Sequence, residues 1–106
     1  MNLHIIEEYL TSLGEITKEE IPGDNVILFK IDDKLVALIE LTSPIKISLR
    51  CDPELATLLR EKYETVMPGQ KLNNKHWNTI LLTGQIEWPE IQGFIRLSYD
   101  LTRDLL

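Results

Sequence analysis

The sequence has 106 residues, of which 43% are hydrophobic and 26% are charged, and this size and composition predict one globular domain over residues 1–106. It has no run of about 20 apolar residues, no basic region typical of a signal peptide and a single cysteine, so we expect no membrane span, no internal disulfide and a reducing, cytoplasmic location. The net charge of −6 disfavours generic binding to nucleic acid or to an anionic membrane, because the overall field repels phosphate.

The first half of the chain is predicted to form a helix, a hairpin and a third strand. Apolar side chains recur every three or four residues in the segment 2–14, which predicts an amphipathic helix that stops at Gly14. The following "EITKEEIPGDN" is predicted to be a loop with a Pro-Gly turn. The runs "VILFKI" and "KLVALIEL" flank Asp32–Asp33 and predict a hairpin, and "IKISLR" alternates apolar and polar residues as a half-solvated strand does.

The second half is predicted to form two helices around a strand. In "CDPELATLLREKYETV", Asp52 is a favourable N-cap and Pro53 a favourable first helical residue. "MPGQKLNNKH" is predicted to be a loop, "WNTILLTG" a strand, and "WPEIQGFIRLSYDLTRDLL" the closing helix. The order is helix, three strands, helix, one or two strands, helix, which indicates an α+β fold with helices packed on an antiparallel sheet.

The polar segment that precedes the last strand lies in the only part of the chain with a positive charge balance. Residues 44–80 contain six basic and four acidic residues, whereas residues 1–43 contain three basic and nine acidic ones. Lysine and histidine can meet phosphates, asparagine amides can hydrogen-bond to bases or sugars, and a tryptophan ring can stack on bases. The candidate nucleic-acid or ligand-binding residues are Lys71, Asn73, Lys75, His76, Trp77 and Asn78, with Arg50 and Lys46 beside them if the third strand is adjacent.

A structural role for the same segment is the alternative. Asparagines form turns and tolerate left-handed backbone, lysines keep loops soluble, and Trp77 can begin a strand with its ring in the core. Residue types alone do not separate this interpretation from a binding role.

Two other chemistries have less support in the sequence. His76 has no second histidine or cysteine at a ligand spacing, and the acidic residues lack a calcium-loop spacing, so we expect no metal site. Cys51 with His76 as a base would supply a catalytic dyad, but a cysteine at a strand end before a helix cap is more typical of a packed thiol. We therefore assign no catalytic residue.

The segment "KISLRCDPELATLLREKYETVMPGQKLNNKHWNTILLTG" resembles the MmcQ/YjbR family of small bacterial proteins, most specifically around residues 73–79. The later "LSYDLTRDLL" is similar to the final helix of that family, with Ser98, Tyr99 and Asp100 in its Ser-Tyr-Asp/Glu core. The resemblance implies the order α-β-β-β-α-β-β-α in a double-wing, frataxin-like arrangement similar to that of secretion chaperones. It places the fifth strand near Gln70–Leu72 or Gln85–Glu87.

Three functions are consistent with this resemblance. Members of the family are commonly described as DNA-binding proteins, and the resemblance implies neither an enzymatic activity nor a cofactor. The first function is therefore binding to DNA. The acidic net charge predicts that this binding is weak and sensitive to salt. The second is a chaperone-like module that captures a protein partner at an exposed strand edge. The third is a small-molecule or metal site beside His76 and Trp77.

Overall fold

The computed structural model describes residues 2–69 and 71–106, which form three helices and six strands. In chain order these are α1 (Leu3–Ser12), β1 (Ile16–Ile21), β2 (Val26–Ile31), β3 (Lys34–Glu40), β4 (Lys46–Arg50), α2 (Pro53–Lys62), β5 (Val66–Pro68), β6 (Trp77–Leu81) and α3 (Trp88–Arg103). The element order is therefore α-β-β-β-β-α-β-β-α, and the α+β class predicted from the sequence is confirmed.

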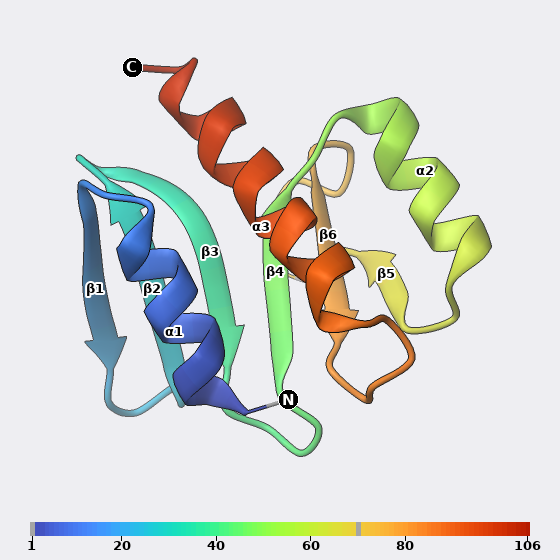
Figure 1. Ribbon diagram of the computed structural model, residues 1–106, viewed down its shortest axis with the longest axis horizontal. Helices are drawn as coiled ribbons and strands as arrows, with labels where there is room; N and C mark the ends of the chain where they lie inside the picture. Colours follow the sequence, from blue (N-terminus) through green and yellow to red (C-terminus); the bar gives the residue numbers. More distant parts are fainter. Residues whose placement is uncertain (1, 70) are drawn as a thin grey trace.

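The six strands form one antiparallel sheet in the order β1-β2-β3-β4-β6-β5 (Figure 1). Ile27, Ile39, Ile47 and Ile80 lie in one register row across β2, β3, β4 and β6, and all four are buried. The helices cover this face of the sheet, with α1 on β1, α3 across β3 and β4, and α2 on β5 and β6. The apolar row and the helices together enclose a single core.

The helix boundaries follow the capping signals in the sequence. The Asp52 side chain accepts a hydrogen bond of 2.9 Å from the backbone N–H of Glu54, as an N-cap residue should. The first helix is followed by Gly14 with a φ of 93°, a left-handed conformation that favours glycine. The Tyr99 hydroxyl on α3 donates a 2.7 Å hydrogen bond to the carbonyl of Leu13, which ties the end of α1 to the last helix.

The structure corrects two expectations about the strands. "EITKEEIPGDN" was predicted to be a loop, but Ile16–Ile21 form β1, paired with β2 from Ile16 opposite Ile31 to Ile21 opposite Val26. The fifth strand of the implied order is Val66–Pro68, neither of the two predicted positions: Leu72 lies in a bend, Gln85–Glu87 form the loop before α3, and Gln70 lies outside the described residues. Within 2–69 and 71–106, no helix is long and apolar enough to cross a membrane.

Candidate functional site

The β5–β6 loop, described from Lys71 to His76, enters β6 at the end that faces the start of α2 and the C-terminal half of α3 (Figure 1). The side-chain oxygen of Asn73 accepts a 2.9 Å hydrogen bond from the backbone N–H of Lys75, which closes an Asx turn. The backbone N–H of His76 donates to the carbonyl of Asn73 at 3.3 Å, and the carbonyl of His76 accepts from the N–H of Cys51 at 2.7 Å. The loop is thus an ordered turn joined to the end of β4.

Arg60 on α2 fixes the same loop from the other side. Its Nη2 donates to the backbone carbonyls of Asn74 and, at 3.3 Å, of Trp77. Its Nε donates to Oδ1 of Asn78 at 2.7 Å, and Nδ2 of Asn78 donates to the carbonyl of Ala56 at 3.2 Å. Because Asn78 is only 3% exposed and both ends of its amide are bonded, this side chain joins α2 to β6 and is not free to meet a ligand.

Arg50 and Trp77 form a second fixed unit at the paired ends of β4 and β6. Trp77 is buried, and the guanidinium carbon of Arg50 lies 4.6 Å from the centre of its ring. Nε of Arg50 donates to the Thr102 hydroxyl at 3.1 Å, and Nη2 donates to the carbonyl of Leu35 at 3.0 Å. Burial lowers the pKa of Arg50 from its ordinary value, yet a guanidinium stays charged at neutral pH. The Trp77 ring is therefore part of the framework and unavailable for stacking on a base.

Gly69, just after β5, is required by the close approach of the backbone to Trp77. The N–H of Gly69 donates to the carbonyl of Trp77 at 2.9 Å. A Cβ added at Gly69 would lie 2.8 Å from Cβ of Trp77, closer than such atoms approach in proteins. The backbone can thus pass directly over Trp77 only because residue 69 has no side chain.

Two of the three candidate lysines, Lys46 on β4 and Lys71 in the loop, share one carboxylate. Nζ of Lys71 lies 3.7 Å from Oε1 of Glu40, and Nζ of Lys46 lies 3.9 Å from Oε2 of the same residue. Glu40 is buried at the end of β3, so the two ammonium groups offset the cost of its desolvation. The Lys71 side chain nevertheless keeps 60% of its surface exposed.

The structure therefore divides the eight candidates into two groups. Three of them, Arg50, Trp77 and Asn78, make the framework, and Lys46 and the side chain of Asn73 are also occupied. Lys75 and His76 stay exposed on the loop, and Lys71 is exposed there as well although its ammonium group pairs with Glu40.

Two residues that the sequence reasoning missed, Arg60 and Glu40, hold these groups in place. Glu40 could have been noticed as the lone carboxylate in an apolar strand, whereas nothing in the helix pattern marks Arg60.

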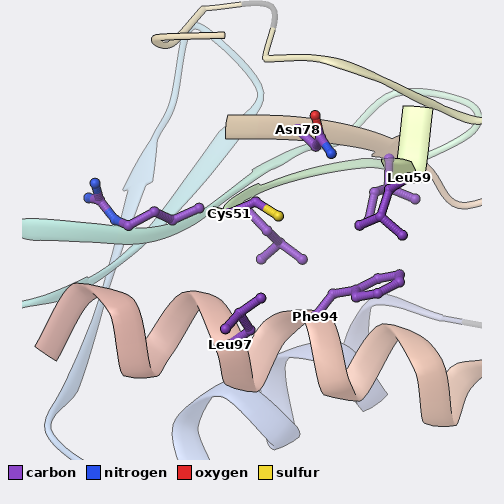
Figure 2. Close-up of a pocket in the computed structure, with 8 residues that line it drawn as sticks. Cys51, Leu59, Asn78, Phe94 and Leu97 are labelled. Carbon is purple, nitrogen blue, oxygen red and sulfur yellow. The ribbon is translucent and has the colours of Figure 1, made fainter. Parts of the chain in front are cut away.

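Cys51 is a packed thiol, as the sequence predicted. It faces the interior between β4 and α3 together with Leu97 and Phe94, beside a cavity of about 10 Å³ (Figure 2). Burial, followed by the charge of Asp52, raises the pKa of this thiol and keeps it protonated at neutral pH. Its backbone contact with His76 brings the two residues together without creating an activated nucleophile. Among residues 2–69 and 71–106, no three His, Cys, Asp or Glu side chains are grouped so that they could hold a metal ion.

The YjbR family model matches residues 11–101, which include this loop and its supports. The chain belongs to the YjbR family. It is 36% identical over 78 residues to the Escherichia coli K12 protein named Uncharacterized protein YjbR, an alignment that covers 73% of this chain and 66% of that protein, so the chain spans just under two thirds of the length of this relative. Uncharacterized protein YyaQ of Bacillus subtilis is 33% identical over 57 residues, which are 54% of this chain and 48% of that protein.

Solved structures agree with this membership in the YjbR family. A crystal structure of a Deinococcus radiodurans protein with a DUF419 domain matches with a TM-score of 0.89 and 26% identity, covering 94% of this chain and 77% of that one. A crystal structure of a Pseudomonas syringae protein matches with a TM-score of 0.83 and 26% identity, covering 96% and 99%. The resemblance seen in the sequence is therefore confirmed for family and fold.

Proposed function

We propose that the chain is a non-enzymatic binding protein that contacts the phosphates of DNA through Lys71, Lys75 and His76. The observation that supports this proposal is that the β5–β6 loop combines a fixed backbone with exposed basic side chains. Its backbone is fixed by Arg60 and by the N–H of Cys51, while these three basic side chains remain exposed. A loop that is ordered before binding loses little conformational entropy when it meets a ligand.

The sheet order also supports a local basic contact in an acidic protein. The acid-rich first 43 residues include β1, which forms one edge of the sheet, whereas β6 and β5, which carry the loop, lie at the opposite edge. For the carboxylates of β1, this separation reduces the repulsion of a bound phosphate, particularly beyond the screening length of about 8 Å at physiological salt. Glu40, which also belongs to the first 43 residues, lies beside Lys71 and pairs with it. With at most three cationic contacts, the affinity is expected to be weak and sensitive to salt.

The test is fluorescence anisotropy of labelled duplex and single-stranded DNA with the wild-type chain and two double variants. Lys71→Gln/Lys75→Gln removes two loop cations, and Lys34→Gln/Lys62→Gln removes two exposed lysines at the start of β3 and the end of α2. Both variants lose two positive charges, so they differ only in where the removed charges lie. We expect the loop variant to lose DNA binding and the control to retain it. Equal losses in both variants, or no binding by the wild type, would contradict the proposal.

Capture of a protein partner is the second candidate, and one observation favours a helix face over a strand edge for it. The edge strand β1 carries Lys18, Glu19 and Glu20, and β5 has three residues and ends in Pro68, so neither edge is suited to pairing with another strand. In contrast, Leu58 on α2 is 60% exposed. A partner that binds there should be lost from a pull-down with Leu58→Lys and retained with the Lys71→Gln/Lys75→Gln variant.

A further inference from the structure

A hollow of about 250 Å³ lies where the start of α2, the last residue of the β5–β6 loop and the C-terminal end of α3 meet. One part of its wall is basic, formed by Arg50 and His76, and another is apolar, formed by Pro53, Leu101 and Leu105. Its volume is slightly below the roughly 300–1,000 Å³ of pockets that take drug-sized ligands. An occupant would therefore be a small molecule with one polar end and one apolar end.

Arg50 lines this hollow, and several contacts hold its guanidinium. Two of its nitrogens are bonded, to the Thr102 hydroxyl and to the carbonyl of Leu35, and its guanidinium carbon lies 4.6 Å from the centre of the Trp77 ring. Within the described residues, its Nη1 makes no hydrogen bond. The guanidinium is thus held in one orientation with a charged donor still available, the arrangement that gives strong hydrogen bonds to a carboxylate.

The same wall limits the charge that the hollow can accept. Asp52 also lines it, and its Oδ1 accepts a hydrogen bond from the N–H of Glu54. A dianionic phosphate would meet this carboxylate, whereas a monoanion needs only the guanidinium. The apolar wall then favours an aliphatic tail on that monoanion, because burying each CH2 group contributes about 0.8 kcal/mol.

We propose that this hollow binds a small aliphatic monocarboxylate, with its carboxylate on Arg50 beside His76 and its tail against Pro53, Leu101 and Leu105. The site shares His76 with the proposed DNA contact but uses neither loop lysine, and its occupation does not depend on DNA binding.

The test is an NMR titration of the isotopically labelled chain with sodium hexanoate to about 20 mM, a range that detects millimolar affinity. We expect saturable shifts at the Arg50 Nε–H and at the methyl groups of Leu101 and Leu105. Hexanamide, which has the same tail without the charge, and inorganic phosphate should bind at least roughly tenfold more weakly.

Two C-terminal variants provide a matched pair that spares the framework. Leu105 lines the hollow and is 52% exposed, whereas Leu106 is 57% exposed and does not line it. Leu105→Asp should weaken hexanoate binding roughly tenfold, as a like charge within about 5 Å would, and Leu106→Asp should not. Absence of saturable shifts, equal affinity for hexanamide, or equal effects of the two variants would each overturn the proposal. Hexanoate binding should persist in Lys71→Gln/Lys75→Gln, so this result is separate from the outcome with DNA.

Discussion

Arg60 on α2 donates a 2.7 Å hydrogen bond from Nε to Oδ1 of Asn78 on β6. This bond joins two elements on either side of the β5–β6 loop, and the same guanidinium holds the loop carbonyl of Asn74. The conformation of the loop that carries Lys71, Lys75 and His76 is therefore fixed by a residue outside the loop.

Replacing Arg60 with alanine should lower the free energy of unfolding by about 2–3 kcal/mol. The substitution leaves the buried Oδ1 of Asn78 without its donor and removes a charged hydrogen bond. Urea denaturation measures the change. Lys62→Ala, on the same helix at an exposed position, should change the free energy by less than about 0.5 kcal/mol. If the two variants lose the same stability, the role given to Arg60 is wrong.

Alanine at position 69 should destabilise the chain by about 1–3 kcal/mol, because its Cβ would lie 2.8 Å from Cβ of Trp77 and 3.2 Å from the Trp77 carbonyl oxygen. Gly93→Ala is the matched control. A Cβ at Gly93 meets nothing within 4 Å, and alanine favours a helix interior by about 1 kcal/mol. The midpoint temperature of thermal unfolding should therefore fall for Gly69→Ala and stay the same or rise for Gly93→Ala. A stable Gly69→Ala variant with an unchanged NMR spectrum around Trp77 would contradict this prediction.

Lysine cannot replace Arg50 without loss. A single ammonium group cannot reproduce both the directed bonds to Thr102 and Leu35 and the contact of the guanidinium with the Trp77 ring. We expect Arg50→Lys to lower the free energy of unfolding by about 1–2 kcal/mol. Arg96→Lys, at an exposed position, should cost no more than about 0.5 kcal/mol, and comparable losses would show that the Arg50 contacts add little.

The buried thiol of Cys51 predicts a specific pH dependence. Burial raises the pKa of this thiol in the folded state above its value in the unfolded chain. As pH rises, the unfolded state therefore loses the proton first, so the contribution of Cys51 to stability is complete below the unfolded pKa and declines as pH approaches the folded pKa. The stability difference between wild type and Cys51→Ala should shrink from about pH 8 to about pH 10. A constant difference across this range would contradict the assignment of a buried, protonated thiol.

Local signals in the sequence were sufficient for most elements of the fold. Asp52 and Pro53 marked the start of α2, and alternation marked β4. The sequence did not predict the first strand because four of its six residues are exposed, so no apolar period identifies it. Only its pairing with β2 makes it a strand. The fifth strand is three residues long, too short for any period to be recognised.

The candidate site was harder to predict because its decisive contacts join distant segments. The turn formed by Asn73 is local, and the sequence indicated that asparagines could form one. The bond from Arg60 to Asn78 spans 18 residues, and the bond from Arg50 to Thr102 spans 52. Residue types could therefore identify this segment as a candidate binding site. Only the fold could show which of its side chains are occupied and which are exposed.

The slope of the logarithm of DNA affinity against the logarithm of salt concentration tests the central claim most directly. Each phosphate contacted on duplex DNA contributes about −0.9 to this slope. If Lys71 and Lys75 meet phosphates, with His76 beside them, the wild-type slope should lie between about −2 and −3, and Lys71→Gln/Lys75→Gln should bring it close to about −1 or abolish binding. A slope near zero for the wild type, or one that the double variant leaves unchanged, would contradict DNA binding through this loop.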